Sequence, residues 1–260
     1  MVRGKKSVHP VNLLQSENAI FNSFSPIIYS NSLTPTYYPN SKLRKNVTFE
    51  LRGVKNLFPF TMWCWNLLGL SFSFSAYVGW RTGRGEQVSP WVLRAALLLW
   101  EMAAPFTLVV GAIVKYVLWP TAFKHNGTVG TTNFRTWIAM CQHNVNVVMA
   151  LSEVALLGGL PVKMSHISLS VLFGVAYVVF TWSIVNLWNP QTGPAFIYIF
   201  MDTTLGAFAT IALYALVGAL MVFYGIFSGV EWLLELSASG LLGHIAFVVL
   251  LCMLVCKVRD

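Results

Sequence analysis

The chain has 260 residues, of which 56% are hydrophobic and 10% are charged, and its formal net charge is +8 at pH 7. Soluble globular domains carry about 25% charged residues, so this composition excludes an ordinary soluble protein. It predicts an all-α polytopic membrane protein. We expect no nucleic-acid partner, because no basic patch is interleaved with stacking aromatic residues.

Residues 1–56 form a basic tail that contains eight Lys or Arg residues and only two acidic ones, Glu17 and Glu50. No apolar run follows the first basic residues, so the tail does not read as a secretory signal. Aromatic and apolar residues are scattered among Ser, Asn and Pro, which is typical of an extended segment laid over another surface. We therefore expect residues 1–56 to dock onto other subunits of a membrane complex, and residues 57–260 to form the transmembrane domain.

Six apolar segments follow the tail, and each is close to the roughly 20 residues that cross a bilayer. They are Leu57–Trp80, Trp91–Leu118, Trp137–Leu157, Ile167–Trp188, Ile197–Phe227 and Ala238–Val255. These segments predict a six-transmembrane-helix bundle, with membrane lipids as partners. Residues 228–237, with two Glu residues one turn apart, are interpreted as a short interfacial helix.

Positive charges predict the orientation of this bundle. With six crossings, the tail, the 119–136 loop with the adjoining Lys115, and the C-terminal end lie on one side and carry 13 Lys or Arg residues. The other side carries Arg81, Arg84, Arg94 and Lys163. The positive-inside tendency then places both termini on a matrix or cytosolic face. A mitochondrial inner membrane is the favoured location, since acidic residues are scarce in the tail. The endoplasmic reticulum or plasma membrane is the alternative.

The third segment carries polar residues at helical spacing: Gln142, His143, Asn146 and Glu153. The bilayer core penalises such groups, so they are expected to face a protein interior. The simplest interpretation is hydrogen bonding between helices. In the second segment, Glu101 is expected to pair with Arg94.

Metal binding is not predicted. Glu153 lies ten residues beyond His143, which is roughly 15 Å along a helix, so these two residues do not share one ion. No His-Glu-x-x-His or comparable ligand spacing is present, and no glycine pattern cradles a phosphate. We expect no metal and no cofactor.

The stretch from Cys141 to Glu153 resembles the third-span region of a family of small polytopic proteins that includes the androgen-induced fatty-acid-ester hydrolases and the insect rolling-stone proteins. The similarity continues through Leu160-Pro161, residues 173–180 and residues 194–202, with residues 60–66 as the matching first-span stretch. The resemblance implies hydrolysis of lipid esters, such as fatty-acid esters of hydroxy fatty acids. It implies Thr61 as nucleophile and His143 as general base.

Chemistry of this kind has further requirements. A hydroxyl is a poor nucleophile unless a base lies within hydrogen-bonding reach. On the family pattern, Asp202 would orient the imidazole of His143, while Asn146 or Gln142 would donate to an oxyanion.

Two main hypotheses for function remain open, together with a third. The first is an accessory structural subunit of a larger membrane assembly, docked through its tail. The second is a Thr61/His143 lipid-ester hydrolase, which a covalent hydrolase probe would label. The third is a proton relay through Glu101, His143 and Asp202, although the sequence lacks the internal repeats common in such transporters.

Overall fold

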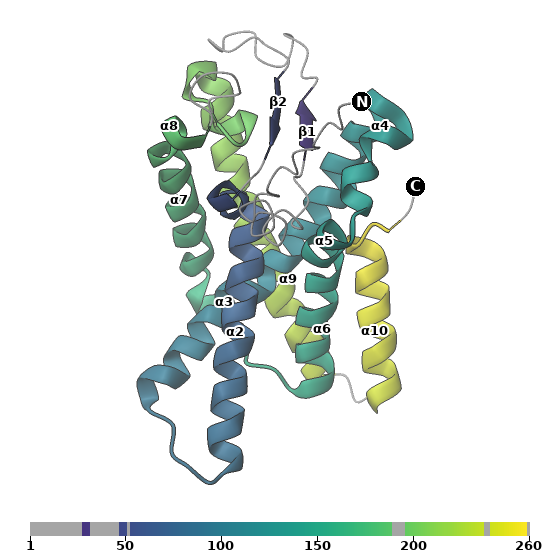
Figure 1. Ribbon diagram of the computed structural model, residues 1–260. Coiled ribbons are helices and arrows are strands. Elements are labelled where there is room, and N and C mark those ends of the chain that lie inside the picture. The colour runs from purple at the N-terminus through teal and green to yellow at the C-terminus, as the bar shows by residue number, and fades with distance from the viewer. Residues whose placement is uncertain (1–27, 32–46, 51–52, 189–195, 237–239, 259–260) are drawn as a thin grey trace, which may run out of the picture.

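The structure is a computed structural model that describes residues 28–31, 47–50, 53–188, 196–236 and 240–258. The described chain is mostly helical (Figure 1). Most of the predicted docking tail, residues 1–56, lies outside the described residues. Within it, the strands β1 (Ile28–Asn31) and β2 (Val47–Glu50) pair in an antiparallel hairpin, with Ile28 opposite Glu50. The sequence did not predict this hairpin, because each strand has only four residues, and over so short a stretch periodicity is a weak signal.

The rest of the described chain is mostly helical, with long helices and shorter helical turns. The long helices are α2 (Phe60–Gly83), α3 (Pro90–Ile113), α7 (Ser168–Ser183), α9 (Ala207–Leu236) and α10 (Gly240–Val255). The third apolar segment forms α5 (Trp137–Met140), a π-helical turn η5 (Cys141–Val145) and α6 (Asn146–Leu157). Shorter elements are η2 (Gly53–Leu57), the π-helical η3 (Val114–Leu118), α4 (Trp119–Gly130), η4 (Thr132–Arg135), η6 (Met164–His166), α8 (Val185–Trp188), η7 (Ile199–Met201) and η8 (Thr203–Leu205).

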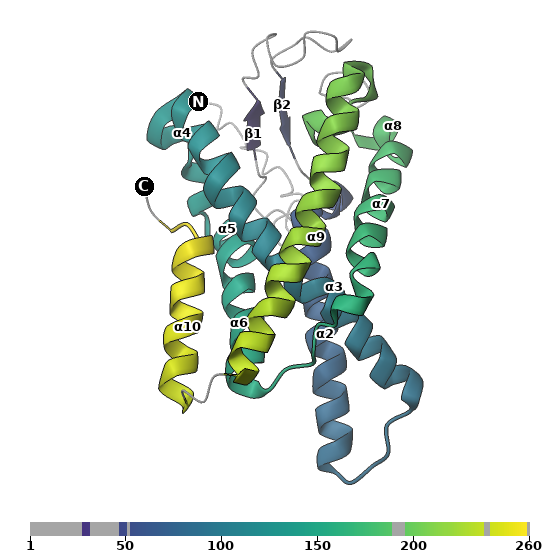
Figure 2. The same cartoon turned by 180° about the vertical axis from the view of Figure 1, so that it is seen from behind.

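The helical rods alternate in direction. In Figure 1 α2 runs downward, α3 to α4 upward, α5 to α6 downward, α7 upward, α9 downward and α10 upward. The α2–α3 turn, the α6–α7 loop and the start of α10 therefore lie towards one end of the bundle. The start of α2, α4, α8 and the end of α10 lie towards the other, as the reverse view in Figure 2 also shows.

Within the described residues, three helices are long and apolar enough to cross a membrane: Pro90–Lys124, Met164–Ser183 and Ala207–Leu236. The apolar window of the first is 72% buried, against 22% and 17% for the other two. The helix that begins with α3 is thus the central rod, while the apolar windows of α7 and α9 are mostly exposed on the outside of the bundle. At about 1.5 Å per residue, the 30 residues of α9 extend about 45 Å, longer than a hydrocarbon core of about 30 Å. The helix crosses the bundle at a tilt in Figure 2.

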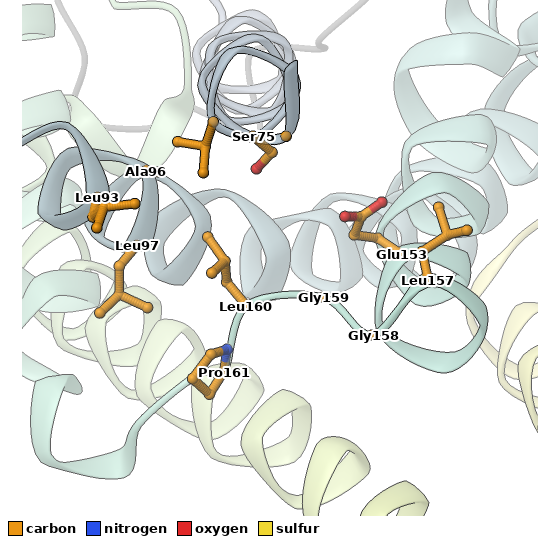
Figure 3. Close-up of a pocket in the computed structure, with 12 residues that line it drawn as sticks. Ser75, Leu93, Ala96, Leu97, Glu153, Leu157, Gly158, Gly159, Leu160 and Pro161 are labelled. Carbon is orange, nitrogen blue, oxygen red and sulfur yellow. The ribbon is translucent and has the colours of Figure 1, made fainter. Parts of the chain in front are cut away.

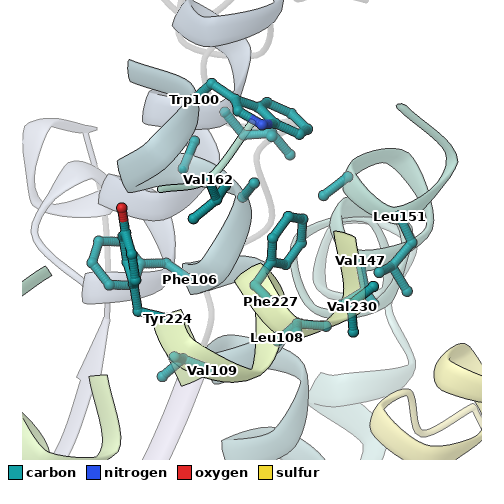
Figure 4. Close-up of a cluster of buried hydrophobic side chains, with 14 of the residues drawn as sticks. Trp100, Phe106, Leu108, Val109, Val147, Leu151, Val162, Tyr224, Phe227 and Val230 are labelled. Atoms are coloured by element: carbon teal, nitrogen blue, oxygen red, sulfur yellow. The ribbon is translucent and has the colours of Figure 1, made fainter. Parts of the chain in front are cut away.

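The main core forms where α3, α6 and α9 meet (Figure 4). Trp100 and Phe106 of α3 pack with Tyr224 and Phe227 of α9, and all four side chains are at most 1% exposed. The rings of Trp100 and Phe227 meet edge to face at 6.3 Å, the arrangement that aromatic quadrupoles favour. Val147 belongs to the same core, so the third segment is packed against the central rod.

Local sequence signals explain several helix boundaries. Pro90 opens α3, where its missing N–H is no loss because the first turn leaves that group unpaired. Gly158 closes α6 in a left-handed conformation with φ of 69°, which glycine adopts without steric cost.

The predicted fifth segment is displaced. Residues 199–205 form two short 3-10 turns, and α9 begins only at Ala207, after Gly206 with φ of 59°. The interfacial helix predicted for residues 228–237 is wrong, because α9 continues unbroken to Leu236. The reason is that Glu231 is not at a water boundary. It is buried and accepts a hydrogen bond from the loop after α6.

Candidate functional site

The best-defined polar cluster surrounds the loop of residues 158–167, which joins α6 to α7. Glu101, on the central helix α3, has no exposed surface. Oε1 of Glu101 accepts a hydrogen bond from the backbone N–H of Lys163 at 3.0 Å. Oε2 lies 2.7 Å from Nδ1 of His166. The predicted partner Arg94 is instead exposed on α3, so that pairing is wrong.

Three side chains of α9 hold the same loop from the other side. Oε2 of Glu231 accepts from the backbone N–H of Val162 at 2.6 Å. Ser228 Oγ donates to the carbonyl of Val162 at 2.8 Å, and Tyr224 Oη donates to the carbonyl of Lys163 at 3.0 Å. Two buried carboxylates and two hydroxyls therefore replace water around one irregular segment. We call Glu101, Tyr224, Ser228 and Glu231 the loop clamp.

The loop clamp has a structural role, because its residues bind backbone groups of the loop. Buried backbone groups cost free energy unless they find hydrogen-bond partners. Here helices α3 and α9 supply those partners to Val162 and Lys163, which lie in the irregular part of the loop before η6. The clamp consequently fixes the α6–α7 connection against the central rod.

A second polar cluster lies at the π-helical turn η5, where the third segment contacts two other parts of the chain. Gln142 donates from Nε2 to the sulfur of Met62 at 2.8 Å, which joins the turn to the start of α2. Asn144 binds both backbone groups of Lys257, with Nδ2 donating to the carbonyl at 2.9 Å and Oδ1 accepting from the N–H at 3.0 Å. The side chains of a widened turn point differently from those of a regular helix, and such turns are frequent at functional sites.

His143 occupies the middle of this turn and is 6% exposed. Its ring lies 6.1 Å from the ring of Phe134. Within the part of the chain that the structure describes, Nδ1 of His143 is buried without a hydrogen-bond partner. An unpaired buried imidazole nitrogen costs free energy, so it is a place where a bound molecule or water would be stabilised.

The contacts of Thr61 and Asn146 differ from those predicted for a hydrolase site. Thr61 is half-buried in the first turn of α2, next to the Met62 that Gln142 contacts. Among the hydrogen bonds recorded for residues 53–188, none joins Thr61 to His143. Asn146 is buried, but its Oδ1 accepts from the N–H of Val147 at 2.8 Å, a contact within its own helix.

The segment that carries Asp202 also approaches the start of α2. Tyr198 Oη accepts from the N–H of Phe60 at 3.2 Å, and Tyr177 Oη donates to the carbonyl of Phe58 at 2.8 Å. Asp202 itself is 3% exposed and follows η7 directly. The structure thus gathers the start of α2, η5 and the 198–202 segment at one end of the bundle.

Glu153 lies apart from that end. It is half-buried near the end of α6 and lines a hollow of about 510 Å³ between the α2–α3 hairpin and the α6–α7 loop (Figure 3). Glu153 is therefore not part of a Thr61/His143 arrangement.

Sequence reasoning missed several residues of these clusters. His166 and Ser228 sit in stretches without periodic polar pattern, and Glu231 was assigned to the interface. The one available signal was the Glu231 and Glu235 pair in an otherwise apolar helix, since a bilayer rarely accepts unpaired carboxylates. No signal in the sequence identifies a backbone N–H as the partner.

No family model, curated protein or solved structure matches the chain. The assignment of a function therefore rests on the residues and their geometry. Two arrangements bear on it, namely the bracing of loops by buried polar groups and the unpartnered imidazole in the π-helical turn.

Proposed function

We propose that the chain is an integral membrane protein that crosses the bilayer six times and acts as an accessory subunit of a larger membrane assembly. The observation that carries this proposal is the use of the buried polar groups. The carboxylates of Glu101 and Glu231 and the amide of Asn144 all bind backbone atoms of loops or of the C-terminal end. Polar groups used in this way rigidify a bundle.

The surface supports the same proposal. Large apolar side chains are exposed along α7, α9 and α10, among them Leu172, Val179, Tyr214, Leu242 and Met253. Such broad apolar faces suit contact with acyl chains or with other membrane helices. The alternating rods and the excess of positive charge at one end favour both termini on the matrix side of a mitochondrial inner membrane, with cytosolic termini in another membrane as the alternative.

Size analysis of native membranes tests this role. We expect the full chain, solubilised in mild detergent, to migrate in a particle much larger than a monomer, and we expect deletion of residues 1–56 to release it. A matched control keeps the tail length and composition but scrambles the order of residues 1–27. Migration of the intact chain as a free monomer with a protease-sensitive tail would contradict the proposal.

A second function, hydrolysis of lipid esters, is favoured by the buried and unpartnered Nδ1 of His143 in the π-helical turn. Here Thr61 Oγ1 would attack the ester carbonyl while His143 accepts its proton. As the ester C–O bond breaks, His143 would return that proton to the departing alcohol, and water would then hydrolyse the acyl-Thr61 ester. Gln142 is close enough to α2 to contact Met62. The family resemblance supports this reading. A substrate dissolved in the bilayer would reach such a site from the lipid side.

A covalent hydrolase probe distinguishes the two functions. An active hydrolase should be labelled, and both His143→Ala and Thr61→Val should abolish labelling. Thr82→Val is the matched control, because Thr82 lies at the far end of α2 and donates only within its own helix. Equal labelling of the intact chain and the His143→Ala variant would end the hydrolase hypothesis.

A further inference from the structure

The hollow between the α2–α3 hairpin and the α6–α7 loop has two chemically distinct ends (Figure 3). Glu153 of α6 and Ser75 of α2 contribute polar atoms to one part of it. Leu93 and Leu97 of α3, with Leu160 of the loop, line the other part with hydrocarbon. The volume of about 510 Å³ lies within the range of about 300–1,000 Å³ that is usual for small-ligand sites.

The polar part of this hollow is negative for two independent reasons. The side chain of Glu153 is a carboxylate, and among the contacts recorded for the described residues it has no hydrogen-bond donor. In addition, α6 ends at Gly158 within the hollow, so the negative end of its dipole lies there. The backbone N–H groups of residues 158 and 159 both reach the carbonyl of Glu153, which leaves the later carbonyls of the helix without intrahelical donors.

The α6–α7 loop passes close to the side chain of Glu153 at Gly159. A Cβ atom on Gly159 would lie 3.1 Å from Cγ of Glu153 and 3.3 Å from its backbone carbon and oxygen. Glycine at this position therefore lets the loop pass directly over the stem of Glu153. The loop clamp fixes the following residues, so the hollow is preformed.

We propose that this hollow binds a membrane lipid whose headgroup carries a primary ammonium, with Glu153 as its counter-ion. The inference rests on the proposed membrane location but not on the accessory role. The negative part attracts a cation, while the leucine-lined part accepts hydrocarbon. A primary ammonium donates hydrogen bonds to the carboxylate and to the Ser75 hydroxyl, which a trimethylammonium group cannot do.

Binding of lipids that differ only in headgroup methylation tests the proposal. The full chain in detergent is titrated with phosphatidylethanolamine, its mono- and dimethylated forms and phosphatidylcholine, all with the same acyl chains, and the retained lipid is measured by native mass spectrometry. Charge-assisted hydrogen bonds are strong, so we expect about tenfold tighter binding of phosphatidylethanolamine than of phosphatidylcholine. Glu153→Gln should remove this preference.

Two further variants make the result specific. Glu235→Gln is the matched control, because Glu235 is an exposed carboxylate at the end of α9 and should leave the preference unchanged. Leu97→Trp fills the apolar part and should weaken the binding of every lipid in the series, with the carboxylate intact. Equal binding of all four lipids by the unaltered chain, or a retained preference in Glu153→Gln, would overturn the proposal. Unaltered binding in Leu97→Trp would overturn it as well.

Discussion

Nδ1 of His166 lies 2.7 Å from Oε2 of Glu101 and joins the turn before α7 to the centre of α3. The two residues are 65 positions apart in sequence, and Glu101 has no exposed surface while His166 is partly exposed. This contact and the neighbouring Lys163 N–H bond attach an irregular loop to the most buried helix. The stability of the bundle should therefore depend on it.

Replacement of Glu101 by Ala leaves the Lys163 N–H and the His166 ring without their partner. A buried donor that loses a charged acceptor costs about 3 kcal/mol, and we expect a loss of stability of that size. Thermal unfolding in detergent measures it. Glu86→Ala is the control, since the side chains of Arg81 and Glu86 are partly exposed to solvent, and a pair of this kind should be worth less than about 1 kcal/mol. An equal effect of the two variants would contradict the structural role of Glu101.

Asn144→Ala should release the C-terminal end. The amide of Asn144 binds both the backbone N–H and the carbonyl of Lys257. Among the described residues, no other side chain binds both backbone groups of Lys257. We expect faster hydrogen exchange in residues 255–258, with a loss of global stability of about 1–2 kcal/mol. Asn66→Ala, on the exposed face of α2, should leave exchange at the C-terminal end unchanged. Unaltered exchange in Asn144→Ala would show that other contacts hold this end.

Gly111→Val should separate three helices. A Cβ atom on Gly111 would lie 2.8 Å from Cγ1 of Val255, 3.0 Å from Cγ2 of Val147 and 3.3 Å from the carbonyl oxygen of His143. The last of these is backbone and cannot move aside, so we expect destabilisation of about 1–3 kcal/mol in thermal unfolding. Gly69→Val is the matched control, because on α2 nothing in the described structure lies within 4 Å of the new carbon. Gly69→Val should be nearly neutral.

The proposed six crossings would place the α2–α3 turn on the membrane side opposite to the C-terminal end. In a chain without its native cysteines, Arg84→Cys and Val258→Cys should react with an impermeant maleimide from opposite sides, and Thr128→Cys should react from the same side as Val258→Cys. The alternating directions of the rods give the physical reason. Reaction of Arg84→Cys and Val258→Cys from one side would rule out the five crossings that the proposal places between these two residues.

Composition and periodicity were sufficient to predict a helical chain with apolar rods, because long apolar runs are a local property of the sequence. Pro90 and Gly158 mark helix ends through their own backbone preferences. The fifth segment was misplaced because hydropathy does not register the break at Gly206 or the burial of Glu231. Those features depend on neighbours that are distant in sequence.

The roles of the polar residues were decided by the tertiary structure. The sequence identified Glu101, His143 and Glu153 as groups that must avoid lipid, since the cost of burying a polar group does not depend on its partner. Which partner each one has does depend on the fold. Packing brings Glu101 into contact with His166 and the Lys163 N–H. It leaves Nδ1 of His143 without a hydrogen-bond partner within the described chain, and it places Glu153 in the lining of a separate hollow.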